Sequence, residues 1–145
     1  MTDATLHTVT DTTAIAVNQD PLGEQGTLRL SGGYKPNKPR PTTNAAFGYQ
    51  IWTGALSNHG AAAVLANLDG NASRKITLTA AELPSSRQAV SKWDVVEAFT
   101  GATMPGITLP VSATVGPHDV AMWMLTPTAA DVAGALADDA AVSTA

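Results

Sequence analysis

The sequence has no cysteine in its 145 residues, which excludes disulfide bonds, zinc–thiolate centres and thiol nucleophiles. Charged residues are also scarce, at 14% against about 25% in an average globular domain. No stretch reaches the roughly 20 consecutive apolar residues of a membrane-spanning helix. Residues 1–13 are polar and lack the apolar core of a signal peptide. These absences leave the compartment open.

A net charge of −4 with scattered basic residues argues against nucleic-acid binding, which depends on clustered lysine and arginine. The chain is long enough for one domain with a sizeable core. Because so few residues are charged, part of its surface is expected to be covered by something else.

Alternating apolar and polar residues between 47 and 126 predict strands rather than helices. The predicted strands are 49–56, 61–68, 75–79, 87–99, 107–115 and 120–125. Ser57–Gly60 has the composition of a hairpin loop, and Gly101–Gly106 that of a turn. The broken alternation at Val95–Val96 predicts a bulge, and Pro110 predicts an edge strand. The expected fold is all-β, an antiparallel two-sheet β-sandwich of Greek-key type.

The segment Val120–Leu125 is apolar on both faces, whereas the outer face of a sandwich strand is normally polar. Two explanations stay open at this stage. The strand is either central and covered by a loop, or part of a sheet that packs against a larger partner.

No residue cluster predicts a catalytic, cofactor or metal site. His7, His59 and His118 lie far apart and are each expected in a loop or turn. Asp94 and Glu97 come nearest to the carboxylate pair of a glycoside hydrolase, but at a spacing of three they point to opposite faces of a strand unless the bulge intervenes.

One signal for covalent modification is present. Asn71-Ala72-Ser73 matches the N-glycosylation sequon in a predicted surface turn. The triplet would matter only in a eukaryotic secretory setting.

Four segments, in order, carry a resemblance to a known family. They read "IAVNQDPLGEQG" from Ile15, "YQIWTGALS" from Tyr49, "AAAVLANLDGNASRKITLTAAEL" from Ala61 and "SATVGPHDVAMWMLTP" from Ser112. Together they resemble the C-terminal part of glycoside hydrolase family 27, the α-galactosidases and α-N-acetylgalactosaminidases. Ala55 stands where the family usually has proline, and the Pro-rich loop at 35–43 looks longer than usual.

The resemblance implies a division into three parts: 1–26, the end of a catalytic barrel and an interdomain junction; 27–127, the sandwich; and 128–145, an Ala-rich tail, disordered or weakly helical. The segment before residue 27 is expected to be irregular, with "AIAV" at Ala14–Val17 ending a barrel layer. The implied junction residues are structural: Asn18, Gln19, Asp20, Pro21, Leu22 and Gly23.

Members of this family are expected to be retaining enzymes with two catalytic aspartates on a (β/α)₈ barrel, and no residue here matches either one. The resemblance therefore implies a non-catalytic domain, inactive alone, whose partner is the barrel that hydrolyses terminal α-galactosides. It implies no cofactor. The family is usually secreted or lysosomal, and the choice between galactose and N-acetylgalactosamine stays open.

Two other functions remain open from the residues alone. A free-standing carbohydrate- or protein-binding module would use exposed aromatic residues, for which the candidates are Tyr34, Tyr49, Trp52, Trp93 and Trp123. An independent hydrolase would use Asp94 and Glu97. A row of exposed aromatics would favour the binding module, and an apolar face without such a row would favour the domain that packs on a barrel.

Overall fold

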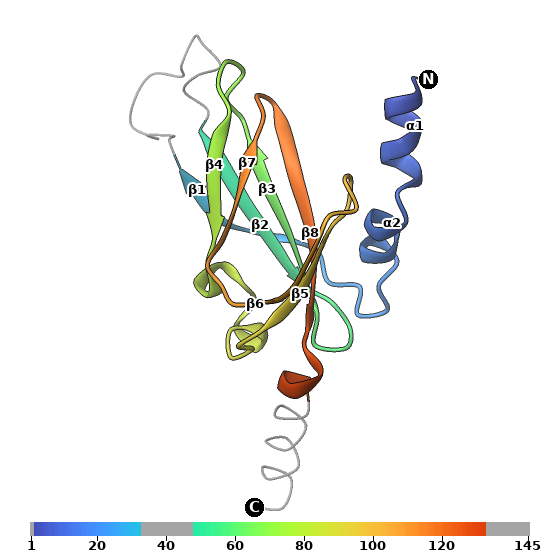
Figure 1. Ribbon diagram of the computed structural model, residues 1–145, viewed down its shortest axis with the longest axis vertical. Helices are drawn as coiled ribbons and strands as arrows, with labels where there is room; N and C mark the ends of the chain where they lie inside the picture. Colours follow the sequence, from blue (N-terminus) through green and yellow to red (C-terminus); the bar gives the residue numbers. More distant parts are fainter. Residues whose placement is uncertain (1, 33–47, 133–145) are drawn as a thin grey trace, which may run out of the picture.

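The computed structural model describes residues 2–32 and 48–132, and within them the chain forms a two-sheet sandwich with two short helices at one side (Figure 1). The larger sheet has the strand order β1-β2-β3-β8-β5-β6, and the smaller one pairs β4 with β7. All pairs are antiparallel. The strands are β1 (Thr27–Gly32), β2 (Tyr49–Ala55), β3 (Ala61–Asn67), β4 (Arg74–Leu78), β5 (Trp93–Glu97), β6 (Thr103–Ile107), β7 (Val111–Val115) and β8 (Asp119–Pro127).

The core lies between the two sheets. Alternate residues of the large sheet, among them Ile51, Leu65 and Leu125, are completely buried. They pack with Ile76 and Leu78 of β4 in one cluster. This period of two is the alternation from which the strands were predicted, and the all-β sandwich is confirmed.

The hairpin between β2 and β3 turns where the sequence predicts it. Asn58 and His59 adopt positive φ values of 54° and 61°, and the Leu56 amide donates to the Gly60 carbonyl at 2.9 Å. Arg87 then holds this hairpin from outside, since its guanidinium donates to the carbonyls of Leu56 and Gly60, each at 2.9 Å.

Arg87–Phe99 is not one strand. Two short 3₁₀ helices, η2 (Ala80–Glu82) and η3 (Ser85–Arg87), precede β5, which begins only at Trp93. Thr79 and Glu82 form a capping box that starts η2. The apolar residues predicted to begin this strand lie instead in the helical connection and in the turn that follows it.

The segment predicted as the turn Gly101–Gly106 contains most of β6. Pro105 lies in this edge strand, at the place where β5–β6 pairing shifts register. Trp93 pairs with Ile107 and Val95 with Met104, so the extra residue belongs to β6 and the irregularity lies before Val95, not at Val95–Val96. Pro110 precedes β7, which has a free edge in the two-stranded sheet.

The N-terminal segment is helical where an irregular chain was expected. Helix α1 (Asp3–Thr10) is capped by Thr2, and α2 (Thr12–Asn18) is capped by Asp11, whose carboxylate accepts from the Ala14 amide at 2.8 Å. The stretch Ala14–Val17 therefore belongs to helix α2, and its place at the end of a barrel layer stays a prediction. No residue of either helix is buried.

At the other end, residues 129–132 form one helical turn. The Asp131 carboxylate accepts from the Ser91 hydroxyl at 2.7 Å and from the Thr128 hydroxyl at 2.9 Å. These two bonds, the Ser91 one first, hold the pKa of Asp131 below its ordinary value. The rest of the predicted tail lies outside the described residues, as do the Pro-rich loop and Tyr34.

Candidate interdomain surface

The implied junction residues form a tight turn after α2. The Gln19 amide closes the helix by donating to the Ile15 carbonyl at 2.9 Å. Asp20 then accepts from the Leu22 amide at 3.0 Å, the Asx turn expected for an aspartate before proline. Gly23 follows with φ +63°, a conformation that glycine adopts without strain.

Asp20 also ties this turn to the sheet. One carboxylate oxygen accepts from the Ser57 amide at 2.8 Å, and the other accepts from the Ser57 hydroxyl at 2.6 Å. The Ser57 hydroxyl is the main reason that the pKa of Asp20 lies below its ordinary value. The N-terminal segment is therefore anchored to the β2–β3 hairpin through one carboxylate.

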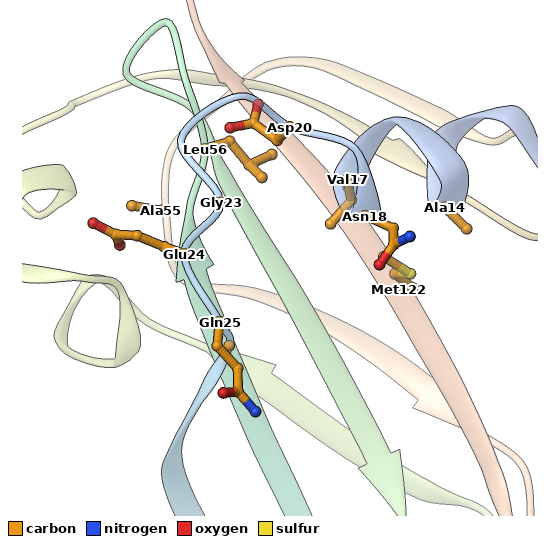
Figure 2. A pocket seen from close by; sticks show the side chains of 11 residues that line it. Ala14, Val17, Asn18, Asp20, Gly23, Glu24, Gln25, Ala55, Leu56 and Met122 are labelled. Atoms are coloured by element: carbon orange, nitrogen blue, oxygen red, sulfur yellow. The ribbon is translucent and has the colours of Figure 1, made fainter.

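A cavity of about 440 Å³ opens where this anchored segment passes over the large sheet (Figure 2). Figure 2 shows Val17 and Asn18 of α2 beside Met122 of β8, and Glu24, which follows the turn, beside Ala55 of β2. A second hollow of about 200 Å³ adjoins it, and the two share Val17, Glu24, Gly26, Ala55, Leu56 and Met122. The first cavity is lined by Ala14, Val17, Asn18, Asp20, Gly23, Glu24, Gln25, Gly26, Ala55, Leu56 and Met122.

The sheet surface beneath these cavities is apolar. We call it the outer face, the side of β1, β2, β3 and β8 that points away from the core. Cross-strand pairing places four of its side chains in one row: Leu28, Trp52, Val64 and Met122. Leu28 is 40% exposed and Trp52 is 38% exposed. The remaining outer-face residues of β2, β3 and β8 are Gln50, Gly54, Ala62, Ala66, Val120, Met124 and Thr126. None of these side chains is charged.

The smaller sheet has the surface that water-facing strands normally show. Its exposed side chains are polar, with Lys75 opposite Thr114 and Thr77 opposite Ser112. The hydroxyls of Thr77 and Ser112 lie 2.8 Å apart in a hydrogen bond. One side of the sandwich is thus suited to water, and the other is suited to an apolar neighbour.

The two helices extend the apolar surface. Leu6 is 48% exposed, Val9 is 59% exposed and Ile15 is 39% exposed. Leu6 and Val9 are three residues apart in α1 and share a helix face. The anchored segment therefore leaves its own apolar side chains uncovered beside the outer face.

The carboxylate pair proposed for hydrolysis is engaged in local structure. Asp94 accepts from the Gly106 amide at 2.7 Å and so holds β6. Glu97 accepts from the Thr100 amide at 2.6 Å and so holds the turn before β6. The two carboxylates bond to different backbone segments, β6 and the turn before it, and neither lines the cavities described above.

The histidines do not gather. His59 lies in the hairpin and His118 in the turn before β8, as expected, whereas His7 lies in α1 and not in a loop. Within residues 2–32 and 48–132, no group of histidine, aspartate and glutamate side chains could hold a metal ion. No helix in these ranges is long and apolar enough to cross a membrane.

The aromatic side chains form no exposed row in the described part of the chain. Trp93 and Trp123 are buried in the core, and Tyr49 packs against it. Trp52 alone among these is exposed. Asn71 is exposed in the turn between β3 and β4, and its glycosylation stays a prediction.

Residues 46–125 match the family model described as the alpha galactosidase C-terminal beta sandwich domain. The chain belongs to this family. The match covers more than half of the chain and includes the outer face of β2, β3 and most of β8. The resemblance to glycoside hydrolase family 27 is thereby confirmed.

Solved structures share the fold at low identity. Alpha-galactosidase I from Mortierella vinacea matches with a TM-score of 0.67 and 18% identity, over 88% of this chain and 30% of that chain. A GH27 β-L-arabinopyranosidase from Geobacillus stearothermophilus matches with a TM-score of 0.64 and 11% identity, over 89% of this chain and 25% of that chain. An α-galactosidase from Saccharomyces cerevisiae matches with a TM-score of 0.59 and 18% identity, over 79% of this chain and 35% of that chain. A comparison with curated protein sequences gives no match.

Sequence reasoning found Asp20 but not its partner Ser57, although both lie in segments that carry the family resemblance. It also missed β1, which supplies Leu28 to the outer face. The only signal for β1 is the short alternation in "TLRL" at Thr27–Leu30.

Proposed function

We propose that this sandwich packs by its outer face against the catalytic (β/α)₈ barrel of an α-galactosidase-type retaining hydrolase. The barrel would hydrolyse terminal α-galactosides, and the sandwich would stabilise it without supplying a catalytic group. The observation that carries the proposal is the uncharged, apolar outer face lying beside a junction that Asp20 anchors to Ser57. Family membership supports the choice of partner.

The extent of the relatives supports the same partner. This chain spans only 30% of the Mortierella enzyme and 25% of the Geobacillus enzyme, so most of each relative lies outside the shared sandwich. Those relatives are described as acting on different sugars. The sugar preference is therefore assigned to the barrel and not to the sandwich.

A fusion protein tests the proposal. This chain replaces the aligned portion of the Mortierella enzyme, and the same enzyme with that portion deleted is the reference. The fusion is expected to hydrolyse a chromogenic α-galactoside and to lose activity on heating more slowly than the deleted form. A parallel fusion on the Saccharomyces enzyme controls for a mismatch with one barrel. If neither fusion outlasts its deleted form, the proposal is wrong.

The binding-module alternative lacks the exposed aromatic row that it needs in the described residues. The hydrolase alternative is not favoured by the two cavities described above, since neither Asp94 nor Glu97 lines them. Neither is supported by a specific observation, and we do not propose either one.

A further inference from the structure

Trp52 occupies an unusual position for an exposed tryptophan. It lies in β2, which has a neighbouring strand on each side, and it is nevertheless 38% exposed. The other two tryptophans of the chain are 0% and 2% exposed. A large aromatic surface left open in the middle of a sheet is typical of a binding contact.

The polar edge of Trp52 is already satisfied. Its indole N–H donates to the Gln50 side-chain oxygen at 3.0 Å, within the same strand. The carbon surface of the ring is therefore what remains for a partner. Such a surface favours an apolar side chain over a ligand that needs a hydrogen bond from the indole.

The hollow beside Trp52 has the size for one side chain. Its volume of about 200 Å³ is smaller than the roughly 300–1,000 Å³ of small-molecule pockets. Gly54 and Ala62 leave the space open, and Val64 and Met122 line it with apolar groups.

The polar side chains of the hollow offer little to a sugar. They are Thr53 and Glu24, and the Thr53 hydroxyl is engaged elsewhere because it donates to the Glu82 carbonyl at 2.6 Å and accepts from Arg29 at 3.2 Å. Glu24 alone is left to contact a hydroxyl. A sugar site normally combines an aromatic face with several converging polar groups.

We infer that Trp52 and this hollow form the anchor of the interdomain contact, into which the catalytic domain inserts one large aliphatic or aromatic side chain. The inference rests on the proposed function and identifies the residue and the hollow that contribute most to binding between the sandwich and the catalytic domain. Tryptophan is one of the residue types enriched among the few desolvated residues that dominate an interface.

The test compares Trp52→Ala with two matched variants, each in the isolated chain and in the fusion protein. Val120→Ala alters another exposed outer-face residue that does not line the hollow, and Thr77→Ala alters the smaller sheet. In the isolated chain all three are expected to unfold at similar temperatures. In the fusion, Trp52→Ala is expected to speed thermal inactivation about tenfold, Val120→Ala less than threefold, and Thr77→Ala not at all.

The outcomes separate this inference from the proposed function. If Trp52→Ala and Val120→Ala accelerate inactivation equally, Trp52 is no anchor, although the outer face is still the interface. If neither differs from Thr77→Ala, the proposed function fails too. If Trp52→Ala unfolds the isolated chain, Trp52→Phe is used in its place. The inference is then overturned if Trp52→Phe speeds thermal inactivation of the fusion no more than Val120→Ala does.

Discussion

Asn67 joins three parts of the sandwich, and replacing it gives the sharpest prediction for stability. Its side-chain amide donates to the carbonyls of Ala72, Val115 and Gly116 at 2.9, 3.1 and 2.9 Å. Its side-chain oxygen accepts from the Asp69 amide at 3.1 Å. The residue is 1% exposed. One side chain thus connects β3 to the β3–β4 turn and to the end of β7.

The side-chain NH₂ group of Asn67 has only two hydrogens, so its three carbonyl contacts share them and count as about two full hydrogen bonds. In Asn67→Ala these and the bond accepted from the Asp69 amide are lost, and buried backbone groups are left without partners. At about 1 kcal/mol for each bond, we expect the free energy of unfolding to fall by about 3 kcal/mol. For a domain of this size that corresponds to a fall of about 9 °C in the unfolding temperature, at roughly 3 °C for each kcal/mol.

The measurement is urea unfolding followed by circular dichroism, with Asn71→Ala as the control. Asn71 lies in the same turn but is exposed, and only its backbone amide is held there, by Asp69 at 2.9 Å. The control is expected to change stability by less than about 0.5 kcal/mol. A loss below about 1 kcal/mol in Asn67→Ala would refute the reasoning.

Three further predictions concern the junction, the tryptophans and the absence of catalysis. Because the pKa of Asp20 is lowered on folding, its anchor stabilises the folded chain above the ordinary carboxyl pKa of 3.8, and this stabilisation is lost as the pH falls through the lowered folded pKa. Asp20→Asn should therefore speed hydrogen exchange of the Ser57 and Leu22 amides at neutral pH. The difference between the variant and the original chain should vanish well below pH 3.8. Acrylamide should quench the fluorescence of Trp52 alone, so quenching that persists in Trp52→Phe would contradict the burial of the other two tryptophans. The chain by itself should not hydrolyse a chromogenic α-galactoside, and turnover abolished by Asp94→Asn would overturn its assignment as a non-catalytic domain.

The sequence predicts the central strands well because their surroundings are simple. β4 alternates buried and solvent-facing residues, β2 and β3 are apolar runs buried along most of their length, and Ser57–Gly60 carries the turn chemistry that a hairpin needs. β6 was missed because Pro105 and Gly106 are turn residues, yet an edge strand with a register shift tolerates both. Local composition alone does not reveal that tertiary position.

The candidate surface was only half predictable. The two-sided apolar pattern of Val120–Leu125 pointed to a covered sheet, and Asp20 was found through the junction motif. The Asp20–Ser57 contact joins residues 37 positions apart and has no periodic signal. The helices α1 and α2 were not predicted. Each begins at a side-chain cap, Thr2 or Asp11, and one polar residue in a short polar segment gives no clear signal for a helix start.

The most direct test of the account places a charge on each side of the sandwich in the fusion protein. Val120→Glu charges the outer face, and Thr77→Glu charges the smaller sheet; both positions are exposed in this chain. Burying an unpaired carboxylate against a partner domain is strongly unfavourable. Val120→Glu should therefore make the fusion lose activity at least about tenfold faster on heating, while Thr77→Glu leaves the rate unchanged. Equal rates in the two variants would contradict the claim that the outer face is where this domain meets its catalytic partner.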